Sequence, residues 1–196
     1  VFHFHYLLKI SSEINSTLNF IIYRIFNFKR KALKMKKEEV ILKCYKVLED
    51  ETPLNFDCGK ICDCKCCKGD ENTGMILFPG EENLIDSNIK IKISQNGEKI
   101  AVCNGSCDRN KRPLSCRIYP FFPLIKEFKG RRRVKIIFDL RADCPLINDE
   151  YEYNKEFLRR LKRVGKTLLN NEETKRMYLD LCDEMNEQIE LINILG

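Results

Sequence analysis

Nine of the eleven cysteines lie between Cys58 and Cys144, and this clustering limits what the chain can fold into more than any other feature. In order they are Cys58-x3-Cys62-x-Cys64-x-Cys66-Cys67, then Cys103-x3-Cys107-x8-Cys116, and finally Cys144. Thiols packed this densely in sequence bind metal, form disulfides or carry out redox chemistry. The two histidines, His3 and His5, lie at the far N-terminus, so the cluster must hold its ligand with sulfur, helped at most by oxygen.

Metal binding is the favoured interpretation of this cluster. The chain has no convincing export signal, so we expect it in the cytoplasm, where thiols stay reduced. The odd number of cysteines also argues against complete pairing. Zinc sites and iron–sulfur clusters both combine closely spaced cysteines with others far along the chain. The pattern therefore predicts Zn²⁺ or an iron–sulfur cluster, at one site or two, without choosing between them.

The lack of histidine narrows the chemistry further. Catalytic zinc usually has a histidine ligand and keeps one position open, whereas an all-thiolate site is more often structural or an iron–sulfur centre. Beyond residue 34 the chain also has no imidazole for acid–base work near neutral pH. A redox dithiol at Cys64-x-x-Cys67 ranks lower, because no strand-to-helix pattern surrounds it. Whether the chain is an enzyme stays open.

Two motifs give the sequence a family resemblance. The paired cysteines Cys66-Cys67 and the downstream Cys116-Arg117-Ile118-Tyr119-Pro120 resemble the hallmarks Cys-x2-Cys-x2-Cys-Cys and Cys-Arg-x-Tyr-Pro of cysteine-cluster proteins known as a zinc- or iron-chelating domain. The resemblance spans roughly residues 58–145. It implies metal chelation, and because some relatives are oxidoreductases and a related group methylates lysines, an iron–sulfur oxidoreductase or a lysine methylase-related enzyme is the alternative. Lys60 and Asp63 stand where the hallmark has cysteine, so the ligand set cannot be transferred directly.

We therefore treat all nine clustered cysteines as candidate metal ligands. They are Cys58, Cys62, Cys64, Cys66, Cys67, Cys103, Cys107, Cys116 and Cys144. Arg117, next to Cys116, is either a donor of N–H bonds to thiolate or sulfide, or a surface arginine. Tyr119 opens an aromatic and proline stretch that either shields the metal from water or packs in the core.

Patterns outside the cluster predict an α+β fold with small antiparallel strands, flanking helices and a C-terminal helical pair. Apolar spacing indicates a helix over 36–49 and helices within 150–194, with Cys44 and Cys182 as core residues. The two C-terminal helices would bury one stripe that includes Phe157, Leu161 and Val164, and a second that includes Leu181, Met185 and Ile192. Short strands are expected at 74–78 and on either side of Asn96-Gly97, where Ile89, Ile91 and Ile93 would share a covered face. A second hairpin is expected from 123 to 140. A metal-binding core at 58–145 would lie within a single domain at 35–196.

The N-terminal segment and the charge distribution limit the classes of partner that we expect for this protein. Residues 1–34 carry six basic side chains and one acid, and we expect them to be translated upstream sequence, with the natural start at Met35, or a disordered segment. Residues 35–196 carry 29 basic and 28 acidic groups, which gives no strong case for nucleic acid. The basic groups of the 123–140 hairpin (Arg131, Arg132, Arg133, Lys126, Lys129 and Lys135) could contact phosphate, but a solvated turn is favoured. No apolar run is long enough to span a membrane.

Overall fold

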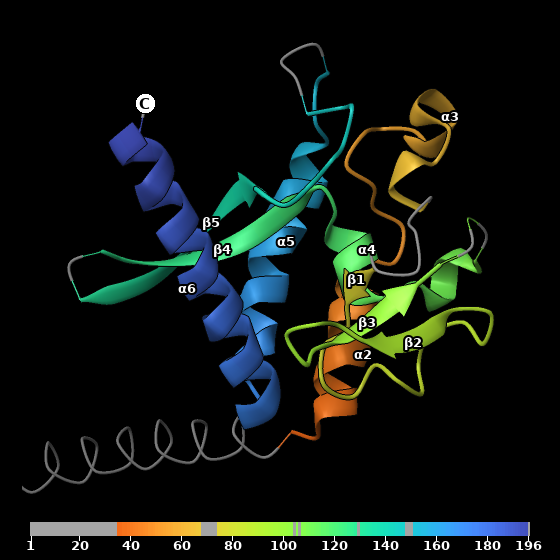
Figure 1. Ribbon diagram of the computed structural model, residues 1–196, viewed down its shortest axis with the longest axis horizontal. Coiled ribbons are helices and arrows are strands. Elements are labelled where there is room, and N and C mark those ends of the chain that lie inside the picture. The colour runs from red at the N-terminus through yellow and green to blue at the C-terminus, as the bar shows by residue number, and fades with distance from the viewer. Residues whose placement is uncertain are drawn as a thin grey trace, which may run out of the picture. The chain divides into compact units, whose positions relative to one another are not determined.

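The computed structural model has the α+β architecture that the sequence predicts, with helices around two small antiparallel sheets (Figure 1). The structure describes residues 35–67, 74–103, 105, 107–128, 130–147 and 151–195. The prediction for residues 1–34 falls outside these ranges. Residues 36–196 form one compact unit.

Helix α2 (Lys37–Val47) begins with Glu38 and Glu39 in its first turn, where acidic groups interact favourably with the helix dipole. Its buried face includes Val40, Ile41 and Cys44, which confirms the predicted helix and the core position of Cys44. This face packs against helix α5 (Lys155–Leu168).

Helix α5 has a well-defined start. The side chain of Asn154 accepts hydrogen bonds from the backbone nitrogens of Glu156 and Phe157, at 2.9 and 3.2 Å. Such a cap satisfies two backbone donors that the helix itself leaves unpaired. The predicted stripe through Phe157, Leu161 and Val164 is fully buried.

Helix α6 (Glu172–Leu195) completes the predicted C-terminal pair, and it buries Leu181, Cys182 and Met185. The predicted stripe is wrong at Ile192, which is 58% exposed. At 24 residues the helix is about 36 Å long, and its last turns run past the elements that cover its first half (Figure 1). Within the described ranges, no helix is long and apolar enough to cross a bilayer.

The first sheet has the strand order β1-β3-β2 and is antiparallel throughout. Its strands are β1 (Met75–Ile76), β2 (Lys90–Ile93) and β3 (Lys99–Val102), and Asn96-Gly97 forms the predicted turn. Ile89 packs with Leu77 and Ala101. The predicted covered face is wrong at Ile91 and Ile93, which are exposed, because β2 is an edge strand and this small apolar cluster does not reach its end.

The second sheet is the predicted hairpin of β4 (Phe121–Phe128) and β5 (Arg131–Phe138). Near its base, the ring of Phe121 stacks on Phe138 with centroids 4.8 Å apart and meets Tyr153 edge-on at 5.1 Å. Helices α5 and α6 both pack against β4. The aromatic stretch after Tyr119 therefore packs in the core, since Phe121 and Phe122 are buried there.

Candidate metal centre

The first group of cysteines lies on a tightly wound loop. Helix α3 (Gly59–Cys62) is one turn long and places Cys58 and Cys62 four residues apart, on one side of the turn. It is followed by Asp63 and Cys64, which both have left-handed backbone conformations with φ near 50°. Two successive non-glycine residues in this region are uncommon, and such strain is concentrated at functional sites. The short helix η1 (Lys65–Cys67) then presents Cys66 and Cys67.

Cys116 sits on helix α4 (Leu114–Ile118), which a buried carboxylate anchors. Oε1 of Glu81 accepts hydrogen bonds from the backbone nitrogen of Leu114 at 2.6 Å and from the hydroxyl of Tyr45 at 2.7 Å. The hydroxyl of Ser115 also donates to the carbonyl of Ile76 at 2.6 Å. These bonds fix α4 between α2 and the first sheet, so Cys116 is placed by the body of the protein rather than by a loop.

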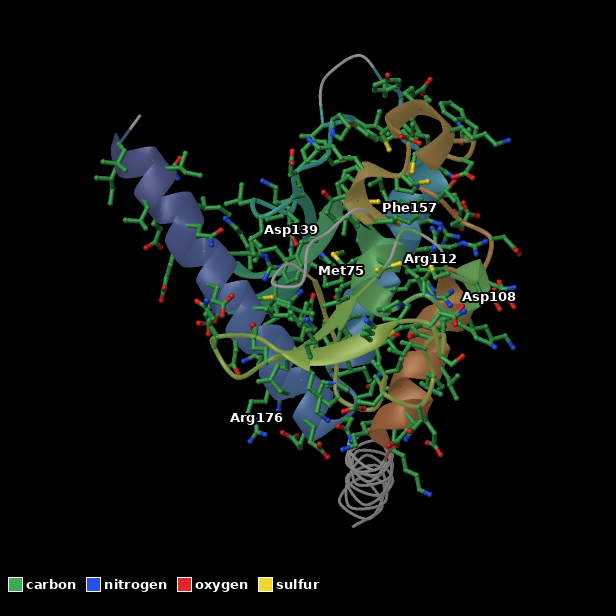
Figure 2. All side chains as sticks on the ribbon, turned by 45° about the vertical axis from the view of Figure 1, so that its right-hand side comes forward. Met75, Asp108, Arg112, Asp139, Phe157 and Arg176 are labelled. Atoms are coloured by element: carbon green, nitrogen blue, oxygen red, sulfur yellow. The ribbon has the colours of Figure 1, made fainter. Side chains whose placement is uncertain are left out.

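The remaining cysteines reach the same region from two other segments. Cys103 directly follows β3, and Cys107 packs against the apolar cluster of the first sheet. Nε of Arg112 donates to the sulfur of Cys107 at 3.4 Å. Cys144 follows β5, where the Lys65–Asp143 ion pair at 3.0 Å joins its loop to η1. Figure 2 shows Arg112 beside sulfur atoms, with further sulfurs along the gold α3 segment.

Two adjoining cavities gather these thiols from four separate stretches of chain. The smaller has a volume of about 80 Å³ and is lined by Cys58, Cys62, Cys66, Cys116 and Cys144. The larger has a volume of about 350 Å³ and is lined by Cys66, Cys67, Cys103, Cys107 and Cys116. Cys66 and Cys116 line both cavities, as do Arg112 and Tyr119.

Cys64 is the predicted ligand that lines neither of these cavities. Its thiol faces back toward α3 and donates to the carbonyl of Gly59 at 3.8 Å. A side chain at Gly59 would place its Cβ only 2.8 Å from this sulfur. Glycine at position 59 thus makes room for Cys64 within the loop, which favours a structural role for this cysteine.

The thiols influence one another's protonation. The sulfurs of Cys66 and Cys67 lie 4.0 Å apart. Their hydrogen bond lowers the pKa of Cys67 to about 6, helped by the positive charge of Arg112, and raises the pKa of Cys66. Burial and the neighbouring Cys67 raise the pKa of Cys116. One anionic thiolate near neutral pH thus raises the pKa of the neighbouring thiols. A bound cation would have the opposite effect and lower the pKa of all the thiols around it.

Arg117 does not direct its strongest contacts at sulfur. Its Nε and Nη2 donate to the carbonyls of Arg112 and Asn110, at 2.9 and 2.5 Å. Its guanidinium carbon stands 3.9 Å from the ring centroid of Tyr45. The contact with a thiol that the sequence suggested for Arg117 is made by Arg112, a residue that sequence reasoning did not single out. An arginine five positions after a cysteine in a loop gives no periodic signal.

The described side chains do not form a closed metal site. Within the described ranges, no three His, Cys, Asp or Glu side chains converge closely enough to hold one ion. Comparison with protein-family models, with curated proteins and with solved structures gives no match. The family resemblance therefore remains a prediction from the motifs.

Proposed function

We propose that this protein binds metal through cysteine thiolates at the two adjoining cavities. The observation that supports this most strongly is the convergence of eight of the nine predicted ligands, from four stretches of chain, on these two cavities. The proposed location is the cytoplasm, whose reducing conditions would keep these thiols available.

The residues present are suited to a soft metal. Thiolates select zinc and iron–sulfur clusters over hard cations such as magnesium. Arg112 supplies a hydrogen-bond donor and a positive charge beside the sulfurs, which would offset the negative charge of a thiolate site. Because no three of these sulfurs converge on one point within the described ranges, metal binding would require their side chains to move closer together.

The two cavities differ in what they can hold. The smaller one has room for a single ion such as Zn²⁺. The larger one has the volume for an iron–sulfur cluster, and four of its cysteines (Cys67, Cys103, Cys107 and Cys116) would supply the usual number of thiolates. This volume favours the iron–sulfur form of the proposal at the larger cavity. The same volume supports an oxidoreductase, whereas none of the described residues that line the two cavities specifically supports a methylase.

Metal analysis of single-cysteine variants tests the proposal. After anaerobic purification, iron, zinc and acid-labile sulfide are measured together with the visible spectrum. With two centres, Cys144→Ala removes metal from the smaller cavity and Cys103→Ala from the larger. Cys116→Ala impairs both, because Cys116 lines both.

Cys64→Ala is the matched control, since it removes a thiol of the same cysteine cluster that lines neither cavity, and its metal content should equal that of the wild type. Equal losses in the Cys103 and Cys144 variants would indicate one shared centre. Metal-free wild-type protein that is folded and has reduced thiols would refute metal binding.

A further inference from the structure

The nearly neutral charge of residues 35–196 conceals a strong separation of charge. Of their 29 basic and 28 acidic groups, six basic and one acidic belong to residues 126–135, at the end of the β4–β5 hairpin. The remainder carries 23 basic groups against 27 acidic ones. A net charge of +5 is therefore concentrated in ten residues on a body with a net charge of −4. The net charge of residues 35–196 as a whole does not reveal this separation.

The register of the hairpin places most of these cations on one face. Lys126 lies directly opposite Arg133, and Phe128 lies opposite Arg131. Since side chains alternate between faces along a strand, Lys126, Arg131, Arg133 and Lys135 share one face. All four are exposed. Figure 1 shows this end of the hairpin extending past α6, away from the cysteine-bearing α3 and α4.

This arrangement places cations directly opposite one another on the two strands. Like charges directly opposite each other on neighbouring strands destabilise a sheet, as at Lys126 and Arg133. The face carries no carboxylate of its own in this stretch, because Glu127 pairs with Arg132 and therefore lies on the opposite face. A polyanion would interact favourably with the cations of this face.

We propose that this hairpin binds the phosphate backbone of double-stranded nucleic acid. A two-stranded antiparallel ribbon is narrow enough to enter the major groove of DNA, and β-ribbons are an established means of nucleic-acid binding. Arginine and lysine on one face can neutralise a row of phosphates. Contacts with phosphate carry no sequence information, so the proposed binding is independent of sequence.

Fluorescence anisotropy with a labelled DNA duplex of random sequence, about two helical turns long, tests the proposal on the full chain. Wild-type affinity should fall steeply with salt, because neutralisation of phosphates releases counterions. The combined variant Lys126→Gln, Arg131→Gln and Lys135→Gln should bind at least about tenfold more weakly, with a salt slope shallower by about one unit for each phosphate that the variant no longer neutralises.

The matched control is the combined variant Lys162→Gln, Arg163→Gln and Lys166→Gln on the exposed side of α5, which removes the same charge elsewhere. It should bind within about twofold of the wild type. Circular dichroism confirms that both variants fold. Equal weakening in the two variants, or no binding by the wild type, would overturn the proposal. Binding to phosphatidylserine vesicles but not to the duplex would overturn it in favour of a membrane surface.

Discussion

At the scale of single residues, Glu81 is the polar side chain on which the site most depends. It is fully buried, and it accepts hydrogen bonds from Tyr45, from Leu114 and from the backbone nitrogen of Phe78. It thereby joins α2 and the turn after β1 to α4, which carries Cys116. Burial raises its pKa to about 7, while the three donors and the charge of Arg117 oppose that rise.

This raised pKa predicts how stability depends on pH. The folded state holds the Glu81 proton up to about pH 7, whereas the unfolded chain loses it near 4.5. Folded protein therefore binds more protons between these values, and the free energy of unfolding falls as pH rises, by an amount on the order of 2–3 kcal/mol. Urea denaturation of metal-free protein at pH 5 and pH 7 measures this. In Glu81→Gln that part of the pH dependence should disappear; an unchanged dependence would assign it to other groups.

Buried polar residues such as Glu81 have roles that the sequence alone does not predict. The core positions of Cys44 and Cys182 follow from helical spacing and are confirmed. Glu81 lies in a Pro-Gly-Glu-Glu turn whose composition resembles a solvated loop, and nothing local indicates that three donors will surround it. Its role depends on packing between segments that are distant in sequence, as does the contact of Arg112 with Cys107.

At the scale of elements, the close crossing of α5 over the hairpin fixes the orientation of the cationic face. Gly165 of α5 lies against β4 and β5: a Cβ at this position would lie 3.1 Å from Cγ1 of Val134 and 3.2 Å from Cβ of Pro123. It would also overlap the hydroxyl of Tyr178, which donates to the carbonyl of Pro123. Glycine is thus retained inside a helix despite its poor helix propensity, because any larger residue would push the hairpin away.

Gly165→Ala should therefore destabilise the protein by about 1–3 kcal/mol, since overpacking outweighs the gain of up to about 1 kcal/mol in helix propensity. Urea denaturation followed by circular dichroism gives the difference. Arg163→Ala on the exposed side of the same helix should change stability by less than about 0.5 kcal/mol. Increased stability in Gly165→Ala would show that the helix and hairpin can separate at little cost.

Elements long enough to show a period were predicted well, whereas the elements that carry the cysteines were not. Helices α2, α5 and α6 and both hairpins follow from spacing and turn residues. Helix α3 has four residues and α4 has five, too few for periodicity to appear. Their positions depend on tertiary bonds, which explains why the sequence predicted a group of candidate ligands but not their division between two cavities, nor the position of Cys64 outside both cavities.

At the scale of the whole molecule, the cysteine-bearing segments are brought together only by the folded body. Hydrogen bonds to Glu81 hold α4, the Lys65–Asp143 pair joins the loop of Cys144 to η1, and the first sheet supports Cys107. The unfolded chain has no preformed site for a metal bound across these segments. The binding free energy of such a metal would therefore add to the stability of the entire fold.

Metal removal should therefore lower the urea midpoint of α5 and α6 as well as that of the cysteine loops. The expected loss is about 2.7 kcal/mol when free metal stands at about 100 times its dissociation constant. Far-ultraviolet circular dichroism follows the helices, and the rate of thiol labelling follows the cavities, in metal-loaded and metal-stripped protein. Coinciding shifts would show that the cavities and the helices unfold as one unit. If stripping exposes the thiols but leaves the helix midpoint unchanged, the metal orders only the loops, because a ligand that stabilised the whole fold could not leave that midpoint unaltered.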